Sequence, residues 1–147
     1  MAITQAMCTS FKQALLDGEM DFSNGTAQTF YIALYTSSAN LDASTAAYTA
    51  TNEVADGNGY ATLGKPLTIS AFPSNGGSGT TVFLSFSNVT WSSSTITARG
   101  ALIYKSGGGN PAVAVLSFGA SDKISTNGDF EIQFPTADAT SAIIRLA

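Results

Sequence analysis

Near the N-terminus, apolar side chains recur at every fourth position. Within residues 3–17 they fall on one face of a helix, and Gly18 follows as a stop signal. The pattern predicts a helix of about three turns over residues 3–17. Its apolar stripe consists of Ile3, Met7, Phe11 and Leu15.

Beyond this segment, apolar positions alternate with polar ones, as they do in β-strands. In the clearest segment, Phe30, Ile32 and Leu34 share one face, while Tyr31 and Tyr35 share the other. Asn-Gly and glycine-rich turns separate the segments, and no second helical pattern lies between them, which favours antiparallel hairpins over βαβ units. The predicted strands cover residues 29–36, 62–70, 81–87, 95–104, 112–118, 129–134 and 142–146.

We therefore expect a mainly β protein, with an antiparallel β-sandwich or jelly-roll-like body and one N-terminal α-helix. The length of 147 residues suits a single domain over residues 1–147, with the helix over residues 3–17 and the sandwich over residues 29–147. Residues 37–59 have no strong period. They form either a solvated surface loop or a segment that lies against a partner. The expected core includes Phe30, Ile32, Leu34, Phe130, Ile132 and Phe134.

The composition limits the kinds of catalytic and metal site that the chain can form. Only 11% of the residues are charged, against about a quarter in a typical soluble domain, so hydroxyl groups must cover much of the surface. The chain has no histidine, which excludes Ser-His-Asp and Cys-His catalytic sites and histidine-ligated metals. One cysteine, Cys8, forms neither an intrachain disulfide nor a zinc site, and we expect it to be a small buried residue.

The distribution of charge argues against two classes of partner. The net charge is −4 and the six lysines and arginines are scattered, whereas nucleic acids and anionic membranes require a concentrated positive surface. No apolar run approaches the roughly 18 residues of a membrane span, and the N-terminus lacks a basic leader. We expect synthesis in a cytoplasm without a secretion signal.

Two groups of acidic residues are candidates for chemistry. Asp129 and Glu131 alternate on one strand, and three acids follow the helix; paired carboxylates are the minimum for glycoside hydrolysis. Nothing nearby indicates a desolvated cleft, so we expect solvated acids and no enzyme activity. Residues 56–59, Asp-Gly-Asn-Gly, suit a calcium ligand set less well than a turn. We expect no cofactor.

Aromatic residues and one arginine complete the candidates. The tyrosines form either a sugar-stacking surface or anchors in a core or interface. Trp91 precedes three serines and is predicted to end a strand at the rim of the sandwich. Arg99 lies in an apolar strand and requires an acidic partner, in an internal ion pair or across a subunit interface. The candidate interface residues are Ile3, Met7, Phe11, Leu15, Tyr31, Tyr35, Trp91 and Arg99.

Several segments of the sequence resemble a family of small structural proteins of tailed bacteriophages. They are AITQAMCTSFK (2–12), FYIALYTSS (30–38), TNEV (51–54), GY (59–60) and TITARGALIY (95–104). The resemblance covers nearly the whole chain, includes no catalytic motif and transfers no functional residues. It implies a component of the virion, assembled in the host cytoplasm.

The first hypothesis is a capsid decoration or cement protein that stabilises the shell as a homo-oligomer, with the N-terminal helix as docking element or cover. Its partners would be the major capsid protein or tail proteins, with no nucleic acid and no membrane. The alternative is a tail, baseplate or small fibre component, in which exposed tyrosines and residues 37–59 bind a host glycan. A third hypothesis is a carbohydrate-binding module encoded by a cell rather than by a phage.

Overall fold

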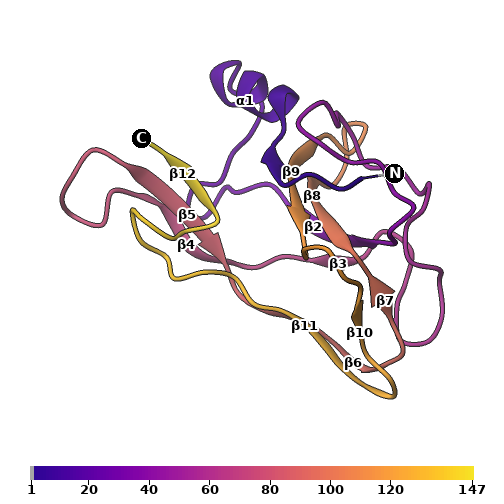
Figure 1. Ribbon diagram of the computed structural model, residues 1–147. Helices are drawn as coiled ribbons and strands as arrows, with labels where there is room; N and C mark the ends of the chain where they lie inside the picture. The colour runs from indigo at the N-terminus through magenta and orange to yellow at the C-terminus, as the bar shows by residue number, and fades with distance from the viewer. Residues whose placement is uncertain (1) are drawn as a thin grey trace.

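The structure is a computed structural model that describes residues 2–147 (Figure 1). Antiparallel pairing of short strands dominates it, as predicted, and one helix lies near the N-terminus. The first layer is a five-stranded antiparallel sheet with the order β1-β9-β8-β2-β3. Its strands are β1 (Ala6–Met7), β9 (Ala112–Ser117), β8 (Gly100–Lys105), β2 (Phe30–Tyr35) and β3 (Lys65–Pro66).

The second layer is a long ribbon built from three sets of paired strands that lie end to end, and each set pairs a strand from residues 69–98 with one from residues 123–146. A three-stranded sheet has the order β12-β5-β4, and two strand pairs, β11-β6 and β10-β7, continue it. In Figure 1 the ribbon runs from β12, β5 and β4 at the left to β11, β6, β10 and β7 at the lower right. Its strands are β4 (Ile69–Ser74), β5 (Val82–Phe86), β6 (Val89–Ser94), β7 (Thr97–Ala98), β10 (Lys123–Ile124), β11 (Gly128–Ile132) and β12 (Ile144–Leu146).

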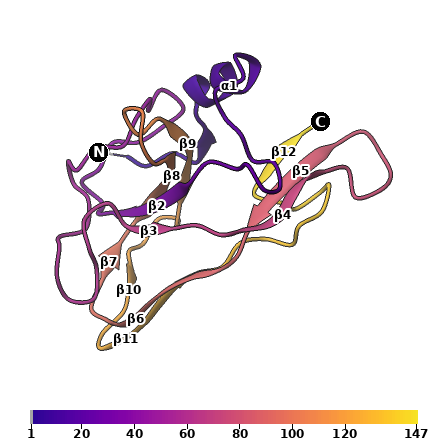
Figure 2. The ribbon, with the colours of Figure 1, turned by 180° about the vertical axis from the view of Figure 1, so that it is seen from behind.

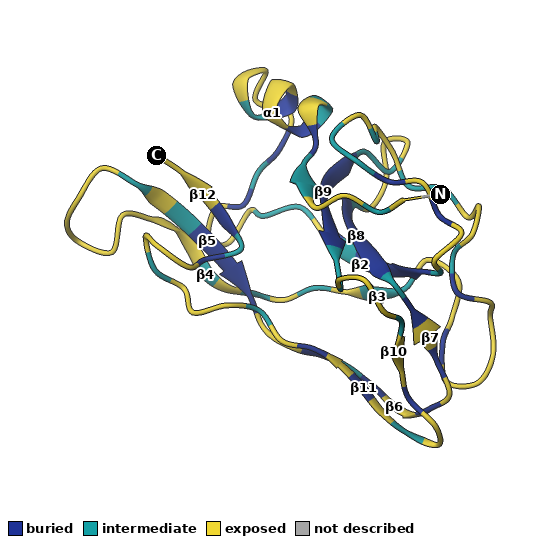
Figure 3. Cartoon of the chain, viewed as in Figure 1, coloured by how far each residue is buried: buried dark blue, intermediate teal, exposed yellow. Residues whose placement is uncertain are grey.

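Aromatic side chains join the two layers. Phe30 of β2 lies 6.4 Å from Phe86 of β5, between ring centroids, and Phe118 lies 6.2 Å from Phe130 of β11. Strands β8 and β9 are buried almost throughout, as the dark strands in the centre of Figure 3 show. Five of the six predicted core residues are buried, and Phe134 is half-buried against them. The result is a β-sandwich-like body with one helix.

The helix is shorter than predicted. It is α1 (Thr9–Leu16), and Cys8 at its N-cap has extended backbone. Residues 3–8 are extended because they pair with other segments: Ile3 bridges Leu41, β1 pairs with β9, and the Cys8 N–H donates to the Val113 carbonyl at 3.0 Å. Backbone pairing with a buried strand thus overrides a helical pattern that local propensity supports only weakly.

Two predicted strands are each divided by a local feature. Residues 62–70 contain a turn at Leu63 and Gly64, which separates β3 and β4 from the segment before them. Residues 95–104 are interrupted at Arg99, where the chain leaves β7 in the ribbon and enters β8 in the first sheet. The alternating pattern alone does not reveal such a change of layer, because both sides of the break are strand-like.

The prediction for Trp91 was wrong. Trp91 lies in the middle of β6 and is 1% exposed, with its ring 6.2 Å from that of Phe130 across the ribbon. The serines that follow belong to the same strand, and Ser94 is buried. Serine is a weak strand former, so the extent of β6 depends on pairing with β11 rather than on its own sequence.

Residues 37–59 are anchored to the first sheet rather than freely solvated. Glu53 bridges Tyr35 at the end of β2, and Ala47 bridges Pro111 beside β9. Leu41 and Val54 are buried. The segment therefore lies against the body of its own chain, and whether its exposed residues also contact a partner stays a prediction.

Candidate functional site

Four tyrosines surround the carboxylate of Glu53. Tyr48 and Tyr60 donate their hydroxyl hydrogens to it, the latter at 2.6 Å, and the Leu63 N–H donates at 2.9 Å. Tyr60 also accepts the N–H of Leu34 at 2.9 Å, which ties the segment to β2. We call Glu53 with Tyr35, Tyr48, Tyr60 and Tyr104 the tyrosine cluster.

The cluster is a structural clamp. Burial and then the charge of Glu53 raise the pKa of Tyr104 to about 12 and raise the pKa of Tyr35 still further. Burial and the hydrogen bond to Glu53 likewise raise the pKa of Tyr48 and Tyr60. Neutral hydroxyls with fixed acceptors hold the polypeptide in place, and their raised pKa values make them poor general bases at neutral pH. No pattern in the sequence indicated that Glu53 is the shared acceptor of Tyr48 and Tyr60.

The predicted interface residues are scattered through the structure. Phe11, Tyr35 and Trp91 are buried in the core, so they do not present a surface for a partner. Tyr31 is half-buried, 6.0 Å from Tyr104 between ring centroids. Arg99 Nε donates to Asp122 at 2.8 Å, which confirms the expected acidic partner.

The remaining predicted interface residues pack at the N-terminal end of the body. Ile3, Met7 and Leu15 are half-buried against the core. Ile3 lies so close to Gly100 that a Cβ there would meet its Cγ2 atom at 2.8 Å. The four stripe residues therefore contact the core from a strand segment and a helix, rather than from one helical face.

Three acidic residues stabilise turns. Hydrogen bonds from the hydroxyl and N–H of Ser23 and from Thr26 lower the pKa of Asp21. Those from the hydroxyl and N–H of Ser44 lower the pKa of Asp42. Asp138 accepts similar bonds from the two residues after Ala139, and its pKa is also lowered. Each motif is an Asx turn, in which an Asp accepts from the backbone two residues further on.

The Asp-Gly-Asn-Gly segment is likewise a turn, as expected. Gly57 and Tyr60 exchange backbone hydrogen bonds of 2.8 and 3.0 Å, and the Asp56 carboxylate accepts the Thr62 N–H. Within residues 2–147 no group of three or more acidic, cysteine or histidine side chains is placed to hold a metal ion.

An apolar concavity of about 270 Å³ opens between α1 and the ribbon. Two of the large apolar residues that line it, Val82 and Leu146, are 41% and 47% exposed, and Leu16, which follows the lining residue Leu15 at the end of α1, is 90% exposed. We call this feature the α1 groove. It is lined by Phe11, Leu15, Met20, Asp21, Phe22, Ser23, Pro73, Val82, Phe83, Leu84, Ile144 and Leu146.

Charged residues of opposite sign lie on two elements that wall the α1 groove, without lining it. Asp17 and Glu19 are exposed in the turn after α1, and Arg145 is exposed on β12, on the other face of that strand from the lining residues Ile144 and Leu146. None of the three charges forms an ion pair within the part of the chain that the structure describes.

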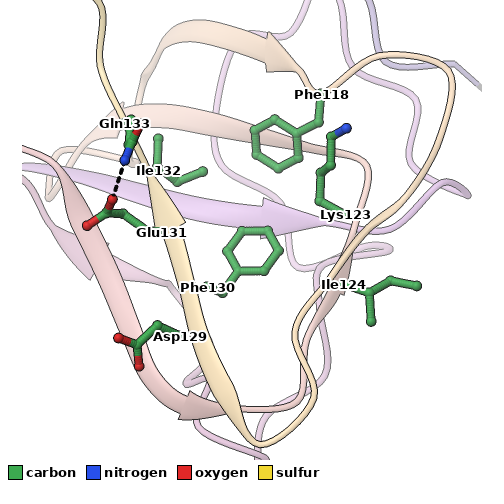
Figure 4. Close-up of a pocket in the computed structure, with 8 residues that line it drawn as sticks. All are labelled: Phe118, Lys123, Ile124, Asp129, Phe130, Glu131, Ile132 and Gln133. Atoms are coloured by element: carbon green, nitrogen blue, oxygen red, sulfur yellow. Dashed lines mark hydrogen bonds between the residues drawn. The ribbon is translucent and has the colours of Figure 1, made fainter.

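A second opening, of about 430 Å³, lies at the other end of the molecule, beside β11 (Figure 4). The rings of Phe118 and Phe130 lie next to one another in its lining, with Lys123 beside Phe118, and Ile124 on the far wall is 67% exposed. Asp129 and Glu131 point away from these rings, to the solvent side of β11. We call this opening the β11 slot. Figures 1 and 2 place α1 and β11 at opposite ends of the chain's fold.

Cys8 is buried, as expected, and makes no disulfide. Burial, with a smaller effect from the charge of Asp42, raises the pKa of its thiol from 9.0 to about 11. A thiol with such a pKa is inert at neutral pH. Among residues 2–147 there is no helix with the length and apolar character that a membrane span requires.

Comparisons with protein-family models, with curated proteins and with solved structures find no match to this chain.

Proposed function

We propose that this protein is a structural component of a bacteriophage virion that works by packing, and most directly a capsid decoration protein that binds the shell as an oligomer. The observation that carries the proposal is the α1 groove, in which the lining residues Val82 and Leu146 are partly exposed and next to which Leu16 is exposed at the end of α1. Large apolar side chains exposed around a concave apolar surface mark a site of protein contact. The sequence segments that resemble small structural proteins of tailed bacteriophages indicate the virion as the setting.

A second copy of this chain is the occupant that best fits the α1 groove. The acidic turn at Asp17 and Glu19 follows α1, which forms one wall of the groove, and the basic Arg145 belongs to β12, which forms another. In a two-fold arrangement each contact occurs twice, so Arg145 of each copy would meet the acidic turn of the other. The same pairing would cover Leu16 and Leu146 and leave the opposite end of the molecule free to face the shell.

The oligomer is tested with purified protein. Leu16→Glu places a charge on a side chain that is 90% exposed, so the fold of the subunit is unaffected. We expect light scattering after size-exclusion chromatography to give an oligomer for the natural sequence and a monomer for this variant. Ile124→Glu, at the other end, is the matched control and should remain oligomeric. A monomeric natural protein, or an oligomer that Leu16→Glu leaves intact, contradicts this contact.

The virion assignment is tested separately, by mass spectrometry of phage particles banded from a lysate of the strain that carries the gene. We expect the protein in the particle band at many copies per particle, and depleted from the soluble fraction of the same lysate. Presence only in the soluble fraction contradicts the assignment, whatever the oligomeric state.

A further inference from the structure

Strand β11 has one edge without a strand partner. Its other edge pairs with β6, from Ser94 to Val89, and within residues 2–147 no other strand joins it. The β11 slot follows this edge, since five consecutive residues, 129–133, line it. Side chains of a strand alternate between faces, so an opening lined by consecutive residues runs along the backbone.

The slot combines a backbone edge with an apolar floor. An unpaired strand edge presents N–H and C=O groups in a row, and another extended backbone matches that row group for group. Phe118 and Phe130 supply the apolar surface beneath, and the exposed Ile124 extends it on the far wall. A segment seated there would pair with β11 and bury alternate side chains against these rings.

The solvent side of β11 restricts the other side chains of such a segment. Asp129 and Glu131 point to that side, and neither forms an ion pair within the described chain. Glu131 accepts hydrogen bonds from the half-buried Thr90 hydroxyl and the exposed Gln133 amide. Directly opposite residues of paired strands share a face, and opposite charges there attract. Lys123 also lines the slot, but it lies on the side of Phe118 and Ile124, away from Asp129 and Glu131 (Figure 4). The fitting segment therefore alternates apolar residues with basic ones, the basic ones on the side of the two acids.

A second copy of this chain does not fit the same edge. Antiparallel pairing of two β11 strands about Phe130 would place Asp129 directly opposite Glu131 of the other copy, in both halves of the pair. Like charges at directly opposite positions are destabilising. We therefore assign the edge to a segment of a different protein rather than to β11 of a second copy.

We propose that the free edge of β11 binds an extended segment of a partner protein by strand addition, and that this segment alternates apolar with basic residues. The partner strand runs through the β11 slot, with its apolar side chains on Phe118 and Phe130 and its basic ones beside Asp129 and Glu131. The proposal is independent of the virion assignment, because it concerns the end of the molecule opposite the α1 groove.

The test uses synthetic peptides with the full protein. One acetylated, amidated octapeptide alternates lysine with valine, a second alternates glutamate with valine, and a third is the lysine peptide with every amide N-methylated. We expect saturable binding of the lysine peptide, together with slower amide hydrogen exchange in β11. The glutamate peptide should bind at least about tenfold more weakly, because two favourable charge contacts become unfavourable. The N-methylated peptide keeps the charge and side chains but lacks the donors, and it should not bind.

Variants locate the site. Asp129→Lys with Glu131→Lys should reverse the preference from the lysine to the glutamate peptide, and both positions are exposed, so the fold is retained. Ile124→Glu should weaken binding of the lysine peptide, because it removes an apolar contact of the valine side chains. Leu16→Glu, next to the α1 groove, should leave binding of this peptide unchanged. Equal binding of the N-methylated peptide, exchange protection outside β11, or protection of β11 by self-association of the free protein would each overturn the proposal.

Discussion

Leu63 and Gly64 form a turn in which both residues have positive φ, 80° and 77°. Positive φ is strained for a branched residue such as leucine, and here the strain is held by two fixed contacts. The Leu63 N–H donates to Glu53, and its carbonyl accepts the Tyr104 hydroxyl at 2.6 Å. Gly64 is pressed against β2, where a Cβ would lie 1.9 Å from the Ile32 carbonyl oxygen.

Gly64→Ala is therefore expected to be severely destabilising. The positive φ costs about 1–2 kcal/mol with a side chain, and the collision with β2 adds about 1–3 kcal/mol. Gly18→Ala is the matched control, because Gly18 has φ 75° but nothing within 4 Å of its added Cβ. Urea unfolding should give a loss near 1 kcal/mol for Gly18→Ala and at least about twice that for Gly64→Ala. Equal losses would contradict the close approach.

At the scale of the elements, the segment that contains Glu53 is attached to the first sheet by polar contacts as well as by burial. Glu53→Ala removes the acceptor of Tyr48, Tyr60 and the Leu63 N–H. Unsatisfied donors in a partly buried cluster cost about 1–3 kcal/mol, so we expect a loss of about 2 kcal/mol in the free energy of unfolding. Glu19→Ala, at an exposed position, should change it by less than about 0.5 kcal/mol.

Hydrogen exchange checks where that loss occurs. Amides of residues 49–63 should exchange faster in Glu53→Ala than in the natural protein, while those of β8 and β9 change only with global stability. A uniform effect across all strands would contradict a local clamp.

Most strands could be predicted because their alternating pattern is a direct consequence of one buried face. Strand β2 and the strands β8 and β9 follow apolar segments closely. The pattern failed where pairing with distant residues decides the outcome. Residues 3–8 are extended through contacts with Leu41 and β9, and no local sequence feature encodes those contacts.

The candidate surfaces were harder to predict than the strands. Several predicted interface residues are large aromatics, and the fold buries Phe11, Tyr35 and Trp91 because large apolar side chains are the best core formers. Leu16, which is exposed, carried a usable signal, since it lies outside the four-residue stripe of its own helix. The β11 slot depends on an unpaired edge, which only the strand order reveals.

At the scale of the whole molecule, buried thiol and phenol groups with raised pKa values make the stability of the fold depend on pH in the alkaline range. The thiol of Cys8 has its pKa raised to about 11 and Tyr104 to about 12, both by burial first. The unfolded chain ionises at its ordinary values, near 9 and 10, while the folded chain keeps these protons. Stability is therefore complete below about pH 8.5 and falls as the pH rises towards 11.

Calorimetry between pH 7 and 11 measures this effect. We expect a constant Tm up to about pH 8.5 and a steady decrease above it. Cys8→Ala should flatten the first part of the decrease, since it removes the group whose ordinary pKa is lowest among those raised. A Tm that stays constant or rises up to pH 10.5 would contradict the burial of these groups.

The chain carries few charges, and in the tyrosine cluster and the Asx turns its polar groups form hydrogen bonds within the chain. Two surfaces remain without partners in the described chain, the α1 groove and the β11 slot, and they lie at opposite ends. Two contact sites at opposite ends suit a protein that links neighbours in an assembly, where weak contacts repeated through an oligomer give high avidity.

Cryo-electron microscopy of the purified particles tests this account most directly. We expect density for the β-sandwich on the outside of the capsid, in symmetric groups whose subunits meet at the α1 groove. Particles whose capsid and tail are fully accounted for by other chains would contradict the proposed function.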